Sequence, residues 1–107
     1  MKRERRFELI YAPQVKGQLQ KIERKYHSLI RHTFESQLNF NPDLETKNRK
    51  PLKRPAESAG DWELRFGPDN RFRVYYAVER KHFRVLILAV GVKQRDRLTI
   101  GGEEVTL

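Results

Sequence analysis

An apolar run toward the end of the chain most limits what it can fold into. Residues 83–92, FRVLILAVGV, carry apolar side chains on both faces of an extended strand. A strand that is apolar on both faces is typical of the centre of a sheet, where both faces are covered. We therefore expect this segment to be a central strand.

Two further segments predict strands that keep one polar face. Residues 62–66 and 72–78 both alternate apolar and polar side chains, and a Gly-Pro-Asp-Asn turn at 67–70 joins them. This period of two is the pattern of a half-buried strand. Residues 78–82 are polar and predict the turn that leads into the central strand.

The N-terminal part predicts a strand followed by two helices. Residues 6–12, RFELIYA, alternate as a strand does, and Pro13 suits the first turn of a helix. The expected inner positions of this helix are Val15, Leu19, Ile22 and Tyr26. Ser28 is expected to cap a second helix, which Asn41-Pro42 ends. The inner stripe of the second helix is expected to be Leu29, Ile30, Phe34 and Leu38.

These elements predict one α+β domain over residues 1–107, since a chain of this length builds a single core. Its N-terminal strand and two-helix hairpin are expected to pack on a small, mostly antiparallel, four-stranded sheet. Residues 41–61, with the basic run KNRKPLKR, are expected to form a long basic loop. The tail, residues 98–107, fits a short strand, a loop or a packed end, while Gly101-Gly102 disfavours a terminal helix.

The charge of the chain favours a polyanionic partner. Lys and Arg number 23 against 14 acidic residues, which gives a formal charge of +9. Nucleic acid is the first candidate, and an anionic membrane surface is the second. No stretch is long and apolar enough to span a membrane, and the N-terminus is charged where a signal peptide is apolar, so we expect a cytoplasmic protein. The chain has no cysteine and three scattered histidines, so neither a metal nor another cofactor is expected.

The polar side of the predicted hairpin carries the candidate functional residues. If Trp62, Leu64 and Phe66 face the helices, Arg65 and Arg73 share the opposite face. Guanidinium groups bind phosphate oxygens as a bidentate fork, and aromatic rings stack on unpaired bases. Arginines on such a face are also commonly solvated or paired across strands, here with Glu63. The candidate RNA contacts are Lys47, Arg49, Lys50, Lys53, Arg54, Arg71, Tyr75 and Arg97.

The predicted order is a strand, a helical hairpin and a basic loop, followed by W-E-L-R-F-G, R-F-R-V-Y-Y and L-I-L-A-V-G-V-K-Q-R. In this order the chain resembles the RelE/ParE superfamily of bacterial type II toxins. The resemblance covers nearly the whole chain and is most specific from Trp62 to Arg95. The RelE branch implies a ribosome-dependent mRNA endonuclease that blocks translation. In that branch the 2′-hydroxyl of the RNA attacks the neighbouring phosphate without a metal ion.

The resemblance also implies roles for individual residues. By position, Arg73 matches the phosphate-stabilising arginine, Arg65 matches a basic residue of the preceding strand, and Lys93 or Arg95 matches the basic residue after the glycine. The chain departs from the RelE pattern at Glu63, which replaces a second lysine, and at the C-terminus, which lacks the catalytic tyrosine. Glu63 is then either a general base or a salt-bridge partner of Arg65 or Arg73.

The resemblance leaves two other functions open. A ParE-like toxin would poison DNA gyrase, and a non-catalytic module would bind RNA without cutting it. For a toxin, the expected partners are a cognate antitoxin and mRNA on the ribosome. Operator DNA is expected to bind only through the antitoxin, and no membrane is expected as a partner.

Overall fold

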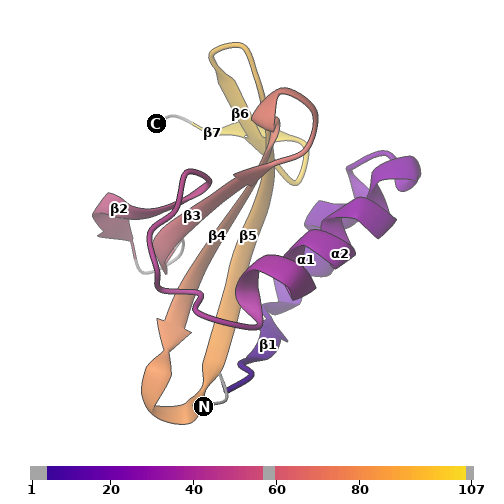
Figure 1. Ribbon diagram of the computed structural model, residues 1–107. Coiled ribbons are helices and arrows are strands. Elements are labelled where there is room, and N and C mark those ends of the chain that lie inside the picture. Colours follow the sequence, from indigo (N-terminus) through magenta and orange to yellow (C-terminus); the bar gives the residue numbers. More distant parts are fainter. Residues whose placement is uncertain (1–4, 57–59, 106–107) are drawn as a thin grey trace.

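The computed structural model describes residues 5–56 and 60–105, which form a curled sheet with a helical hairpin on one face (Figure 1). The helices are α1 (Pro13–Gln20) and α2 (His27–Leu38). The strands are β1 (Glu8–Tyr11), β2 (Arg49–Ala56), β3 (Gly60–Phe66), β4 (Phe72–Glu79), β5 (Arg84–Gln94), β6 (Arg97–Ile100) and β7 (Glu103–Val105). Short 3₁₀ turns occupy Arg24–Tyr26, Pro68–Asn70 and Arg80–His82. Within the described ranges, no helix is long and apolar enough to cross a membrane.

Strand β5 is the centre of the sheet, as its apolar sequence predicts. It pairs antiparallel with β4 along one edge. Along its other edge, it pairs parallel with β1 and then antiparallel with β6. Among the described residues, the sheet has seven strands, in the order β2-β3-β4-β5-β6-β7 with β1 beside β5, so the expectation of four strands is wrong.

The additional strands come from segments that lack a strand pattern. Residues 41–61 were expected to be a loop, but β2 occupies 49–56 and pairs with β3, while residues 57–59 lie outside the described part. Two prolines, Pro51 and Pro55, hide this strand from a sequence reading, although an edge strand tolerates them. The tail forms the β6–β7 hairpin around Gly101-Gly102, and residues 106–107 are not described.

The main core lies between the helices and one face of the sheet, which we call the helix face. Ile30, Phe34 and Leu38 of α2 are buried there, as expected, but Leu29 is 39% exposed. The sheet contributes Leu64, Phe66, Phe72, Val74, Tyr76, Val85, Ile87 and Val90. This alternation confirms which side of β3 and β4 faces the helices.

The C-terminal end of α1 and the start of α2 differ from the prediction. Side chains from outside each helix donate hydrogen bonds to carbonyls near its C-terminal end. Helix α1 stops at Gln20, and the Nε2–H of His27 donates to the carbonyl oxygens of Leu19 and Ile22, each at 2.9 Å. Helix α2 begins at His27 with no side-chain cap, so the predicted cap at Ser28 is wrong. At its other end, the Arg49 guanidinium donates to the carbonyl of Gln37. Such contacts satisfy carbonyls that have no partner within the helix.

A smaller cluster covers the opposite face of the sheet, which we call the distal face. Tyr75, Ala89 and Leu98 are buried there, and Leu52 and Ile100 pack against them. Leu52 comes from β2 and Ile100 from β6, so side chains from strands on either side of β3, β4 and β5 pack over this face. This cover explains why β5 is apolar on both sides.

Candidate functional site

The strand register gathers charged side chains on the distal face. Directly paired residues of neighbouring strands share a face. Lys50 pairs with Glu63 and Glu63 with Tyr75, while Arg65 pairs with Arg73. In the next pairing, Arg73 lies opposite Gly91, and Lys93 lies opposite Leu98 of the distal cluster. Lys50, Arg65, Arg73 and Lys93 therefore lie on the same face of the sheet as Glu63.

Glu63 is the centre of this group. Its Oε1 accepts a hydrogen bond from Arg65 Nε at 2.6 Å and lies 3.6 Å from Arg73 Nη1. Glu63 and Arg73 are each only 8% exposed. The Arg65 side chain is 44% exposed. The predicted salt bridge of Glu63 therefore forms with both arginines, and Arg65 is the more accessible of the two.

The turn between β3 and β4 fixes Arg73. Arg73 Nε donates to the backbone carbonyl of Asn70 at 3.1 Å. The turn bends sharply because Asp69 and Asn70 both adopt left-handed conformations, with φ of 55° and 51°. Asn and Asp adopt this conformation more readily than other side chains. The Gly-Pro-Asp-Asn sequence thus places a backbone acceptor where it holds the guanidinium.

Tyr75 lies on β4 directly opposite Glu63, on the distal face. Its side chain is 6% exposed, which leaves little of the ring for the predicted stacking on a base. Burial raises its pKa, and the negative charge of Glu63 and a hydrogen bond with that carboxylate raise it further. The hydroxyl therefore remains protonated at neutral pH and holds Glu63 in place.

The other predicted contacts are more scattered. Arg71 and Arg97 lie on the helix face of the sheet, away from Arg73. Arg71 reaches the Tyr26 hydroxyl at 3.4 Å, and Arg97 pairs with Gln94. Arg95 forms the β5–β6 turn with a φ of 56°. Lys47 and Lys53 are exposed, and the side chain of Arg54 is not described.

Arg49 corrects the prediction of an exposed basic loop. It lies in β2 opposite Leu64, which places it on the helix face, and it is 7% exposed. Its guanidinium is held by the Gln37 carbonyl, and its Nε is buried without a hydrogen-bond partner. Arg49 therefore supports the fold rather than presenting a charge to RNA.

Sequence reasoning missed that Lys50 belongs to the distal face. It was expected in a loop, because no strand was predicted at 49–56. Its Nζ lies 3.7 Å from Glu45, and the side chain is 52% exposed. The alternation of Lys50 and Leu52 with Arg49 and Pro51 is the pattern that indicates its orientation. Within residues 5–56 and 60–105, no three acidic or histidine side chains gather as they would to bind a metal ion.

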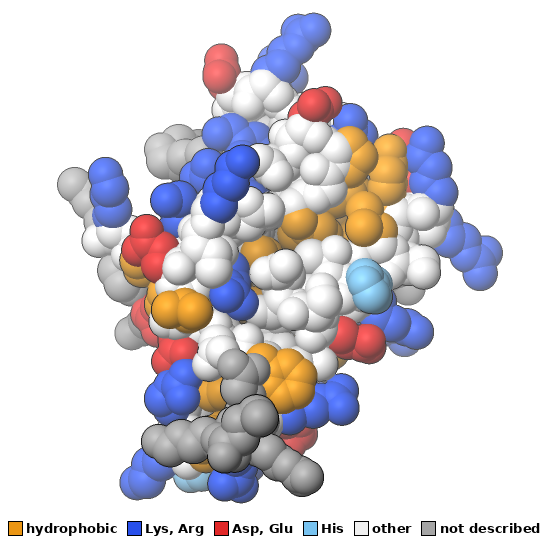
Figure 2. Space-filling model, viewed as in Figure 1, with side chains coloured by type: hydrophobic (Ala, Val, Ile, Leu, Met, Phe, Trp, Pro, Cys, Tyr) orange, Lys and Arg blue, Asp and Glu red, His pale blue; other side chains and the backbone are white. Residues whose placement is uncertain are grey.

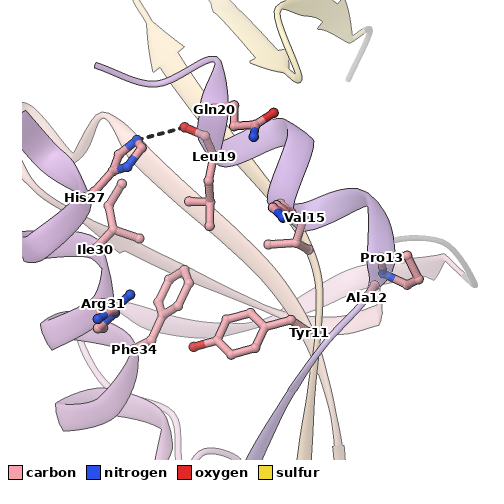
Figure 3. A pocket seen from close by; sticks show the side chains of 11 residues that line it. Tyr11, Ala12, Pro13, Val15, Leu19, Gln20, His27, Ile30, Arg31 and Phe34 are labelled. Carbon is pink, nitrogen blue, oxygen red and sulfur yellow. Dashed lines mark hydrogen bonds between the residues drawn. The ribbon is translucent and has the colours of Figure 1, made fainter. Parts of the chain in front are cut away.

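A second candidate surface is a groove of about 590 Å³ between the end of β1 and the two helices. Val15, Leu19, Ile30 and Phe34 line it together with Tyr11, which is 45% exposed (Figure 3). Lys16 and Arg31 also line the groove. Figure 2 shows an apolar patch with Lys and Arg side chains around it on the side of the molecule where the helices lie.

Comparisons of sequence find no relative. No family model matches the chain. No curated protein matches it either.

A comparison of structures does find similar chains. The fold is similar to that of a chain in the crystal structure of the toxin-antitoxin complex RelBE2 from Mycobacterium tuberculosis, with a TM-score of 0.68 and 22% identity. The match covers 87% of this chain and 98% of that one. The chain therefore shares its fold with a chain of that toxin-antitoxin complex.

Proposed function

We propose that the chain is the toxin of a toxin-antitoxin pair, and that its distal face binds and cleaves RNA. The observation that supports this most directly is the Arg65–Glu63–Arg73 group, held by the 67–70 turn and by Tyr75. The similarity to a chain of a toxin-antitoxin complex supports the toxin assignment. Messenger RNA on the ribosome is the proposed substrate.

The proposed reaction uses the positive charge of this group. A phosphodiester that binds Arg73 and Arg65 takes the place of Glu63 in its hydrogen bond with Arg65 and its ion pair with Arg73. The released carboxylate can then accept the proton of the RNA 2′-hydroxyl, whose oxygen attacks the phosphorus and displaces the 5′ oxygen. The two guanidiniums stabilise the charge that develops on the phosphate oxygens.

The leaving oxygen needs a proton, which an ammonium group can supply. Lys93 lies on the same face, on β5, and Lys50 lies beside Glu63 on β2. We assign proton donation to Lys93, because the Lys50 ammonium is near Glu45. For Arg95, in the turn after β5, we propose an RNA contact outside the reacting centre.

The groove between the helices is the proposed docking site of the antitoxin. Its walls are apolar and its two cations are Lys16 and Arg31, so it suits an amphipathic helix with acidic residues beside its apolar stripe. We propose that such a segment of the antitoxin folds as it binds.

The test is primer extension on a translated reporter mRNA in cells that lack the antitoxin. Wild type is expected to produce cuts within translated codons, Arg73→Ala and Glu63→Gln are expected to produce none, and Lys81→Ala is the matched control on an exposed turn. Intact mRNA with arrested growth would overturn the nuclease proposal in favour of gyrase poisoning. Intact mRNA with normal growth would point to a non-catalytic RNA-binding module.

A further inference from the structure

A polar hollow of about 180 Å³ lies on the helix face, away from the distal arginines. The 3₁₀ turn before α2, the start of β4 and the β5–β6 hairpin surround it. Its polar lining residues are Lys21, Glu23, Tyr26, Arg71, Gln94 and Thr99. Hydrogen-bond donors predominate among them, and Glu23 is the acid.

Arg71 is held in the hollow by neutral groups. Its Nε donates to the carbonyl of Pro68 at 3.2 Å, and its Nη1 donates to the Tyr26 hydroxyl at 3.4 Å. The guanidinium carbon also lies 5.9 Å from the centre of the Tyr26 ring. None of the acids in the described part of the chain forms an ion pair with Arg71. A guanidinium has five N–H donors, so donors remain for an anion.

Lys21 brings a second cation to the hollow. A Cβ at Gly102 would lie 3.6 Å from Lys21 Cδ, so the Gly101-Gly102 turn lies along the stem of this side chain. Lys21 has no ion pair with the acids that the structure describes. Glu23 lies 3.5 Å from the ammonium of Lys25, which offsets its charge. The net charge of the side chains that line the hollow is therefore positive.

The position of the hollow suggests a nucleic-acid phosphate. Arg73 and Arg71 bind carbonyls of the same 67–70 turn, Asn70 and Pro68, from opposite faces of the sheet. An RNA strand with one phosphate on Arg73 reaches Arg71 by passing around this turn. Backbone contacts of this kind position a strand without reading its bases.

We propose that this hollow binds a phosphate group of a single RNA strand that also contacts the distal face. The inference rests on the proposed function only in taking RNA as the ligand, and it does not require cleavage. Free inorganic phosphate has the same chemistry, so the two sources must be separated by experiment.

The experiment measures binding of a short 2′-O-methyl oligouridine, which lacks the attacking hydroxyl, over a range of salt concentrations. Lys21→Ala and Arg71→Gln are expected to weaken binding about fivefold each in 0.1 M salt and to reduce the salt slope by about 0.7 each. Lys81→Ala, on an exposed turn, is the control and should leave both values unchanged. Glu23→Gln is expected to strengthen binding. Thermal unfolding checks that each variant is folded.

A titration of the wild type with inorganic phosphate, followed by NMR of the Lys21, Arg71 and Gln94 signals, separates the two ligands. If the variants bind the oligonucleotide as tightly as wild type, the proposal is overturned, and shifts with phosphate would then indicate a site for a small anion. If oligonucleotide binding depends on Lys21 and Arg71 but natural mRNA is not cut, this inference stands and the nuclease proposal falls.

Discussion

Tyr75 and Tyr76 are neighbours in the sequence but belong to opposite faces of the sheet. Tyr76 is fully buried in the main core, and its hydroxyl donates to the carbonyl of Pro42 at 2.8 Å. Tyr75 lies in the small distal cluster, and its hydroxyl binds the carboxylate of Glu63. Two residues of the same type thus serve the fold on one face and a charged site on the other. From this comparison we expect the stability of the fold and the proposed function to depend on different faces of the sheet.

The largest expected effect comes from the helix face. Leu64 is fully buried in the main core. Leu64→Ala should therefore lower the free energy of unfolding by about 2–5 kcal/mol. Urea unfolding followed by circular dichroism measures this loss. Leu98→Ala on the distal face is the comparison, and an equal loss there would show that both clusters support the fold equally.

The next effect should appear on the distal face without loss of stability. Arg73→Ala is expected to reduce RNA cleavage about 100-fold to 1,000-fold, because it removes a donor to the charged transition state. Single-turnover cleavage of a ribosome-bound mRNA measures this rate. Its urea midpoint should stay close to that of wild type. A variant that unfolds at much lower urea would contradict the separation of the two faces.

Alkaline pH should destabilise the folded state through both tyrosines. Burial raises the pKa of both, so the folded state keeps their protons above the ordinary value of 10.0. The resulting stabilisation is complete below pH 10 and is lost as pH rises above it, where tyrosines of the unfolded chain ionise. Tyr75→Phe and Tyr76→Phe should each make this fall shallower.

Glu63→Gln sharpens the same comparison. Because the carboxylate helps to raise the pKa of Tyr75, its removal should make the Tyr75 hydroxyl ionise at lower pH, while Tyr76 is unaffected. Absorbance at the tyrosinate band follows Tyr75 when it is taken as the difference between the Tyr76→Phe variant and the Tyr75→Phe/Tyr76→Phe double variant, because Tyr11 and Tyr26 are present in both. An unchanged titration would mean that Glu63 does not act on this hydroxyl.

The smallest effect is expected at the end of α1. His27→Ala removes the donor to two carbonyls near the helix end and should cost about 1 kcal/mol of stability. His27→Gln retains an N–H donor and should recover part of the loss in thermal unfolding. Equal losses in both variants would show that the imidazole matters through packing instead.

Periodicity was enough to predict strands β1, β3 and β4 and both helices, because each buries one regular face, and an apolar run predicted β5. It also placed Arg65, Arg73 and Glu63 together, since strand alternation alone decides their side. It did not predict β2, whose prolines and charges resemble a loop. It did not indicate the position of Arg71, which precedes β4 and whose guanidinium donates to the Tyr26 hydroxyl on the helix face. Such contacts depend on the tertiary structure and leave no local pattern.

The prolines of β2 also bear on how copies of the chain behave toward one another. Among the described strands, β2 lies at one end of the sheet order, so none of them pairs with its outer edge. An uncovered edge invites pairing with the same edge of another molecule, which begins aggregation. Pro51 and Pro55 remove N–H donors from the strand, and Lys50 and Lys53 place like charges along it. The prolines and lysines that made β2 hard to predict therefore also disfavour edge-to-edge pairing between copies of the chain.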